Sequence, residues 1–146
     1  MDVVREILKN RAVIVPASAW LLAQLIKVIT VVIKDKKLDF SRFVGSGGMP
    51  SSHSAYIVSM STVVGKNMGW GSVPFGISLA VALIVMYDAA GVKRAAGKQA
   101  EVLNKIIFNY GYKEDFDQKL KELIGHTPFE VLVGALLGIL IGYLFG

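Results

Sequence analysis

The chain has 146 residues, of which 53% are hydrophobic and 18% are charged, a balance that few water-soluble domains of this size show. We therefore expect a single membrane-embedded domain over residues 1–146. Cysteine is absent, which excludes disulfides, thiolate metal sites and a cysteine nucleophile. The net charge of +5 indicates loops near anionic lipid head groups first and an anionic substrate second, and we expect no nucleic-acid partner.

Four apolar stretches are predicted to be membrane-spanning helices, which makes the fold class an all-α integral membrane bundle. In chain order they are 12–33, 53–70, 72–92 and 127–146. The first is long enough to cross a hydrocarbon core of about 30 Å. The second is short, so we expect it to cross only if it extends to Trp70, with the Lys66 ammonium snorkelling toward the head groups.

With four crossings, the loop 34–52 and the segment 91–126 lie on one face of the membrane. Apolar residues recur at helical spacing beside charges within 91–126, which predicts two amphipathic helices near the interface. Their charges are expected to face solvent or head groups. The two segments hold eleven Lys and Arg residues against four on the other side, so the positive-inside rule favours a cytoplasmic position of this face in the cell membrane.

The first of two histidines, His53, follows the sequence Gly-Gly-Met-Pro-Ser-Ser at 47–52. A proline followed by two serines is typical of a helix start, whose unpaired backbone N–H groups can hold an anion. We therefore predict that Ser51 and Ser52 contact phosphate, with Gly48 allowing a close approach. A plain loop-to-helix corner capped by serine is the alternative, and this segment alone does not decide between them.

The second histidine, His126, stands four residues before Glu130. If one helix includes both, they share a face, and the carboxylate can fix the imidazole tautomer. That arrangement suits a nucleophilic or acid–base histidine. In the alternative, Thr127, Pro128 and Glu130 form a capping box in which the carboxylate only stabilises the helix start. The two roles compete for the same carboxylate.

Ionisable residues inside membrane spans are costly, so Lys27 and Asp88 are candidates for function, the latter in a supporting role. Lys27 and Lys34 are seven residues apart on one helix face and can direct cations at a bound phosphate. Snorkelling of Lys27, or its pairing with Asp88, explains it equally well. Arg42 and Arg94 are further predicted phosphate ligands, because a guanidinium suits phosphate oxygens.

Five stretches together resemble the divergent branch of the type 2 phosphatidic acid phosphatase superfamily, related to acid phosphatases and vanadium-dependent haloperoxidases. They are Ala-Gln-Leu-Ile-Lys (23–27), Gly-Gly-Met-Pro-Ser-Ser-His-Ser (47–54), Val-Met-Tyr-Asp-Ala-Ala-Gly-Val-Lys-Arg (85–94), Ala-Gly-Lys-Gln-Ala-Glu-Val-Leu-Asn (96–104) and Gly-His-Thr-Pro-Phe-Glu-Val (125–131). The superfamily uses P-S-G-H and S-R-x5-H-x3-D elements. Residues 50–53 resemble the first element, and His126 with Glu130 resembles the end of the second.

This resemblance implies a metal-independent phosphatase, without cofactors, that hydrolyses a polyprenyl or glycerolipid phosphate or pyrophosphate. If the roles of the superfamily residues apply to the matching residues here, His126 attacks phosphorus and forms a phosphohistidine. Glu130 then orients the His126 imidazole, and His53 protonates the leaving oxygen. Leu120 stands where the superfamily has arginine, so Arg94 would have to supply that guanidinium.

Two alternatives follow from the same residues. The first is a non-catalytic membrane protein that binds or carries lipid phosphates. The second is haloperoxidase-like chemistry with vanadate, which mimics phosphate. Four spans are also fewer than the lipid phosphatases of the superfamily have, so a homodimer that encloses the lipid is a further expectation.

Overall fold

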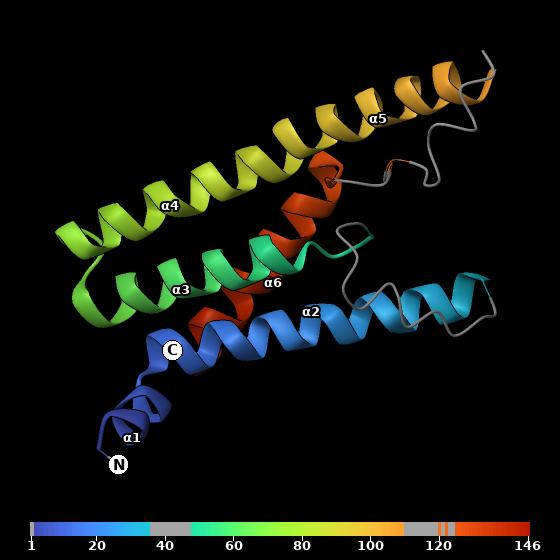
Figure 1. The fold of residues 1–146 in the computed structure, drawn as a ribbon. Coiled ribbons are helices and arrows are strands. Elements are labelled where there is room, and N and C mark those ends of the chain that lie inside the picture. Colours follow the sequence, from blue (N-terminus) through green and yellow to red (C-terminus); the bar gives the residue numbers. More distant parts are fainter. Residues whose placement is uncertain (1, 36–47, 110–119, 121, 123–124) are drawn as a thin grey trace.

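The computed structural model describes residues 2–35, 48–109, 120, 122 and 125–146, and each regular element in these ranges is an α-helix (Figure 1). The predicted all-α membrane bundle is therefore confirmed. The helices are α1 (Asp2–Lys9), α2 (Arg11–Asp35), α3 (Ser52–Met68), α4 (Val73–Ala90), α5 (Val92–Asn109) and α6 (Pro128–Phe145). The short helix α1 was not predicted. The second of the two predicted amphipathic helices falls mostly outside the described residues.

Three stretches of the described chain are long and apolar enough to cross a membrane: Arg11–Thr30, Val73–Phe108 and Pro128–Phe145. The predicted count of four spans is not confirmed, because α3 has only 17 residues and is not among them. Helix α3 packs against α2, α4 and α6, and its buried residues are mostly small or hydroxyl-bearing. A helix surrounded by other helices needs less apolar surface than one facing lipid, which accounts for its composition.

Helices α3 and α6 approach each other closely through small residues. Gly134, Gly138 and Gly142 of α6 face the backbone of α3, and a Cβ on Gly138 would lie 2.6 Å from the Ala55 carbonyl oxygen. Glycines spaced four apart form one stripe along a helix and allow this contact. The other face of α6 exposes large apolar side chains such as Leu136, as expected for a surface in contact with lipid.

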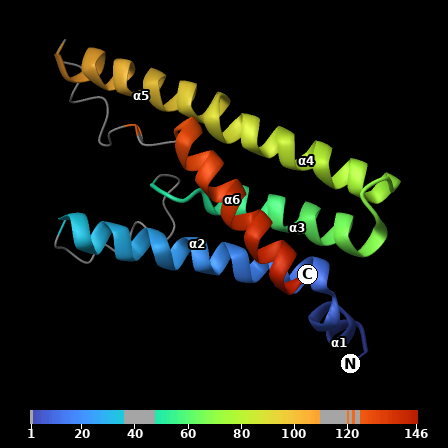
Figure 2. The ribbon, with the colours of Figure 1, turned by 180° about the vertical axis from the view of Figure 1, so that it is seen from behind.

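The start of α2 and the last turn of α6 lie close together at one end of the bundle (Figure 2). The Gly146 carbonyl oxygen accepts hydrogen bonds from Arg11 Nη1 at 3.2 Å and from Lys66 Nζ at 2.8 Å. Lys66 also donates to the Tyr143 carbonyl at 2.8 Å. The Lys66 ammonium therefore binds the free carbonyls at the end of α6, a favourable place for a cation, and its snorkelling toward the head groups stays a prediction.

The histidine-bearing segments lie at the opposite end of the bundle. There α4 ends at Ala90, and α5 continues in nearly the same direction after a break at Gly91 (Figures 1 and 2). The starts of α3 and α6 reach the same end, and the backbone N–H of Ser51 donates to the Glu130 carbonyl at 3.1 Å. The residue before α3 therefore contacts the first turn of α6.

Candidate functional site

His126 lies in the turn that leads into α6 and is held there by its backbone. Its N–H donates to the Ala89 carbonyl at the end of α4 over 2.9 Å, and the residue is only 3% exposed. Helix α6 begins at Pro128, with Thr127 as N-cap. The helix does not extend back to His126, and the alternative in which Thr127 and Pro128 start the helix is confirmed.

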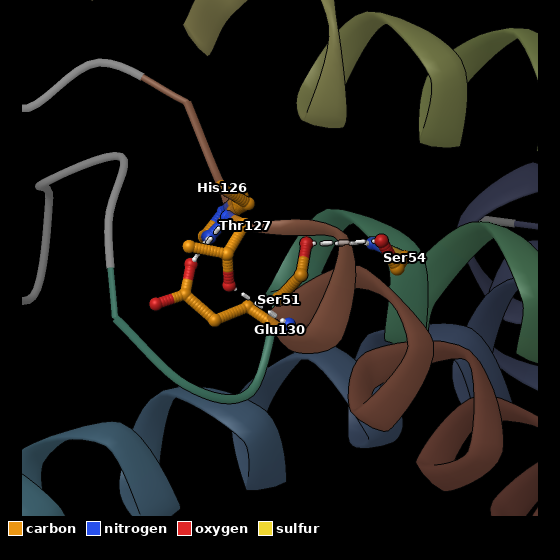
Figure 3. A network of polar contacts seen from close by, with 5 residues as sticks. All are labelled: Ser51, Ser54, His126, Thr127 and Glu130. Atoms are coloured by element: carbon orange, nitrogen blue, oxygen red, sulfur yellow. Dashed lines mark hydrogen bonds and ion pairs between the residues drawn. The ribbon is translucent and has the colours of Figure 1, made fainter.

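The Glu130 carboxylate performs both of the roles that the sequence left as competitors. The backbone N–H of Glu130 donates to Thr127 Oγ1 at 3.2 Å, and Oε2 of Glu130 accepts from the Thr127 N–H at 3.0 Å. These two bonds complete the capping box. The same Oε2 lies 3.1 Å from Nδ1 of His126 (Figure 3). One oxygen can accept two hydrogen bonds, so the cap and the contact with the imidazole coexist.

This contact determines which ring nitrogen of His126 is available. When Nδ1 carries the proton and donates to Glu130, Nε2 keeps a lone pair. Nε2 is buried and has no hydrogen-bond partner among the residues that the structure describes. A buried nitrogen without a partner is costly in a folded protein, so this atom is a candidate for contact with a ligand.

The pKa of His126 is lowered from its usual value, mainly because burial disfavours the charged imidazolium. The positive charges of Lys27 and Lys93 lower this pKa further, whereas the hydrogen bond and negative charge of Glu130 raise it. Burial and the two lysines prevail, so the imidazole is neutral near pH 7. The neutral form is the one that can act as a nucleophile.

Ser51 caps α3, as in the alternative interpretation of this turn. Its hydroxyl oxygen accepts hydrogen bonds from the Ser54 N–H at 3.4 Å and from the Ser54 hydroxyl at 3.0 Å (Figure 3). Ser51 and Ser52 are 0% and 2% exposed. The contact of these two serines with phosphate stays a prediction, and the first-turn N–H groups of α3 are the better placed donors at this position.

Lys27 enters the site from α2, where it is 2% exposed. Its ammonium is close enough to Glu130 and His126 for their charges to interact. Gly48 has a φ of +90°, and a Cβ there would lie 3.4 Å from Cγ of Lys27. A glycine therefore allows the turn before α3 to pass directly over the lysine side chain.

Asp88 pairs with Lys93, not with Lys27. Its Oδ2 lies 3.1 Å from Lys93 Nζ, so the proposed Asp88–Lys27 pair is not formed. Both partners are partly exposed, and pairs of this kind contribute little to stability. The charge of Lys93 also acts on His53 and His126, which makes it a site residue that sequence reasoning missed. The only local signal was its position five residues after Asp88.

The remaining predicted cations are Arg94, Lys34 and Arg42. Arg94 is exposed, and its backbone packs against Gly125, where an added Cβ would collide with it. The backbone of Lys34 belongs to α2, but its side chain lies outside the described residues, as does the whole of Arg42.

His53 lies in the first turn of α3 and is exposed. It lines a cavity between α2, α3 and α4 together with Trp20 and Val85. Burial lowers the pKa of His53, and the charges of Lys93, of His126 when protonated, and of Lys27 lower it further, whereas Asp88 raises it. These interactions place His53 in the same cluster as the second histidine.

Asn104 fixes the segment before His126 and was also missed. It is 3% exposed. Its amide donates to the Leu120 carbonyl at 2.8 Å and accepts from the Leu120 N–H at 2.9 Å, and it donates to Glu122 Oε1 at 2.8 Å. Helix α5 therefore acts as a support for the chain that approaches the site.

These features define a helical membrane protein with a buried histidine–carboxylate pair, flanked by lysines, at one end of its bundle. The chain belongs to the Divergent PAP2 family, whose match covers residues 8–141. A similar relative is the uncharacterized membrane protein YuiD of Bacillus subtilis (strain 168), which is 42% identical over 148 residues, or 93% of this chain and 94% of the relative. No solved structure matches the chain.

Proposed function

We propose that the protein is a membrane-embedded phosphatase that hydrolyses a lipid phosphate or pyrophosphate through a phosphohistidine intermediate, without a metal. The observation that carries this proposal is the His126 imidazole, whose Nδ1 lies 3.1 Å from Glu130 Oε2 while its buried Nε2 has no partner among the described residues. Membership of the Divergent PAP2 family supports a phosphatase-related role.

In the proposed reaction, Nε2 of His126 attacks phosphorus as the bond to the lipid oxygen breaks. His53 gives a proton to the leaving oxygen, and the Glu130 carboxylate stabilises the positive charge that develops on the phosphorylated imidazole. Water then attacks phosphorus, the P–N bond breaks, and His53 takes up the proton that the water releases. Lys27, Lys93 and the first-turn N–H groups of α3 stabilise the equatorial phosphate oxygens.

The test uses purified full-length protein in detergent with a panel of polyprenyl and glycerolipid phosphates and pyrophosphates. We expect phosphate release that is lost in His126→Ala and retained in Asn67→Ala, a control at the opposite end of α3. An acid-labile phosphoprotein should form with the wild type and be absent in His126→Ala. Release that is equal in both proteins would refute the mechanism. Tight binding of a phosphate analogue without turnover would favour the carrier function instead.

The membrane side is part of the proposal, because the excess of Lys and Arg in the site-bearing loops favours the cytoplasmic face of the cell membrane. Labelling of a cysteine introduced at exposed Gln99, in intact cells and in inverted vesicles, tests it. Labelling from the outside of intact cells would contradict the assignment.

A further inference from the structure

A cavity of about 400 Å³ lies between three helices next to His53. Its lining residues are Ala17 and Trp20 of α2, His53, Tyr56 and Ile57 of α3, and Val85 of α4. Apart from the imidazole, the phenol and the indole N–H, the lining is hydrocarbon. The proposed reaction uses only the His53 imidazole, so the apolar part of this cavity has no assigned role.

The cavity runs from the site toward the middle of the membrane. Trp20 and Ala17 precede Lys27 by seven and ten residues on the same helix, and at 1.5 Å per residue they lie about 10 Å and about 15 Å further along its axis. Half the thickness of a hydrocarbon core is about 15 Å. The cavity is therefore aligned with the lipid chains of one leaflet.

The charges around the cavity indicate what kind of ligand fits it. Lys93 and Lys27 act on His53 at the site end, whereas the residues toward the membrane centre are apolar. An amphiphile with an anionic head and a hydrocarbon tail matches this gradient. Ligand cavities range from about 300 to about 1,000 Å³, so this one is at the small end and suits one chain.

We infer that this cavity binds one hydrocarbon chain of a phosphorylated amphiphile whose phosphate lies beside the two histidines. The inference rests on the proposed function for the position of the phosphate. It adds that the substrate is recognised through its chain as well as through its head group, and that the chain extends between α2 and α4. A water-soluble phosphate ester would leave the cavity empty and would bind weakly.

The fluorescence of Trp20 allows ligand binding in the cavity to be measured without turnover. The chain has two tryptophans, and Trp70 lies beyond the other end of α3, so the Trp70→Phe protein reports on Trp20 alone. We would titrate this protein in detergent with a long-chain alkyl phosphate brominated along its chain, and with the matching brominated alcohol. The Trp20→Phe protein, which keeps Trp70, is the control.

We expect saturable quenching of Trp20 by the brominated phosphate, at concentrations about tenfold below those needed for the alcohol. Ala17→Phe, which fills the cavity, should weaken the binding about tenfold, whereas Ala80→Phe at an exposed position of α4 should not. Equal quenching by phosphate and alcohol, equal binding in Ala17→Phe, or equal quenching in the Trp20→Phe control would overturn the inference.

Activity separates this inference from the proposed function. Quenching without phosphate release would refute the phosphatase and leave the chain-binding cavity standing. Phosphate release that does not depend on chain length and is unchanged in Ala17→Phe would refute the cavity and leave the phosphatase standing.

Discussion

Replacing Glu130 by glutamine separates the structural role of this residue from its proposed catalytic role. Glutamine also serves at the third position of a capping box, so Glu130→Gln keeps an oxygen that can accept from the Thr127 N–H. The change removes the negative charge that lies 3.1 Å from Nδ1 of His126. The helix start should therefore survive while the imidazole loses its charged partner.

The expected loss of rate in Glu130→Gln follows from the strength of the hydrogen bond between Glu130 and His126. The side chains of His126 and Glu130 are 2% and 21% exposed, so water screens their interaction only in part. A hydrogen bond to a charged group is worth about 1.5–3 kcal/mol and a neutral one about 0.5–1.5 kcal/mol. The imidazole becomes positive in the transition state, so losing the charge of Glu130 should raise the activation free energy by about 1–2 kcal/mol. This corresponds to a rate about 5- to 30-fold lower.

Thr127→Ala is the matched variant, because it removes the cap and leaves the carboxylate. It should lower the free energy of unfolding by about 1 kcal/mol, whereas Glu130→Gln should change the melting temperature little. Both proteins would be compared by thermal unfolding and by kcat/KM for lipid phosphate hydrolysis. If Glu130→Gln keeps the full rate, or if each variant loses rate only in proportion to its stability, Glu130 is a helix cap and nothing more.

Three further predictions concern the surroundings of the site. Gly138→Leu should lower the free energy of unfolding by about 1–3 kcal/mol, because its Cβ would lie 2.6 Å from a backbone oxygen of α3. In thermal melts Gly71→Leu, which has open space around it, should show no such loss. Lys27→Met should raise the pKa of His126, because the charge of Lys27 lowers it. Since the imidazole must be neutral to attack, the acidic limb of the pH–rate profile should move to higher pH. An unmoved limb contradicts this assignment. Asn104→Ala should lower the free energy of unfolding by about 1–3 kcal/mol and speed up amide hydrogen exchange at Leu120. Unchanged exchange at Leu120 would show that this asparagine does not support the segment.

The sequence predicted the helices because long apolar stretches and helix-start residues are local signals. α2, α4 and α6 each begin within one residue of the expected position. α3 begins where Pro50 and the serines indicated, yet its role as the central helix was not predicted. Its serines and glycine lower its hydropathy, so the sequence suggests a poor membrane span. Hydropathy does not show that three other helices surround α3.

The contact between His126 and Glu130 was predictable from a four-residue spacing, although the geometry that produces it is a capping box and not a continuous helix. Long-range partners gave no comparable signal. Lys93 acts on both histidines from the first turn of α5, and Asn104 binds a segment 16 residues away. Neither relation is visible in the local pattern of residues.

The ends of three helices determine what kind of ligand suits the site. α3 and α6 both begin there, so the positive ends of two helix dipoles point toward the histidines, and Lys27 adds a buried cation. The local negative groups already have partners. Glu130 binds His126 and the Thr127 N–H, and the Ala89 carbonyl at the negative end of α4 accepts the His126 N–H. The charges of Lys27 and Lys93 are balanced by those of Glu130 and Asp88, so the positive charge that remains is that of the two helix starts. An anion such as phosphate balances it, whereas a neutral head group leaves it unbalanced, so head-group charge should govern binding more strongly than head-group shape.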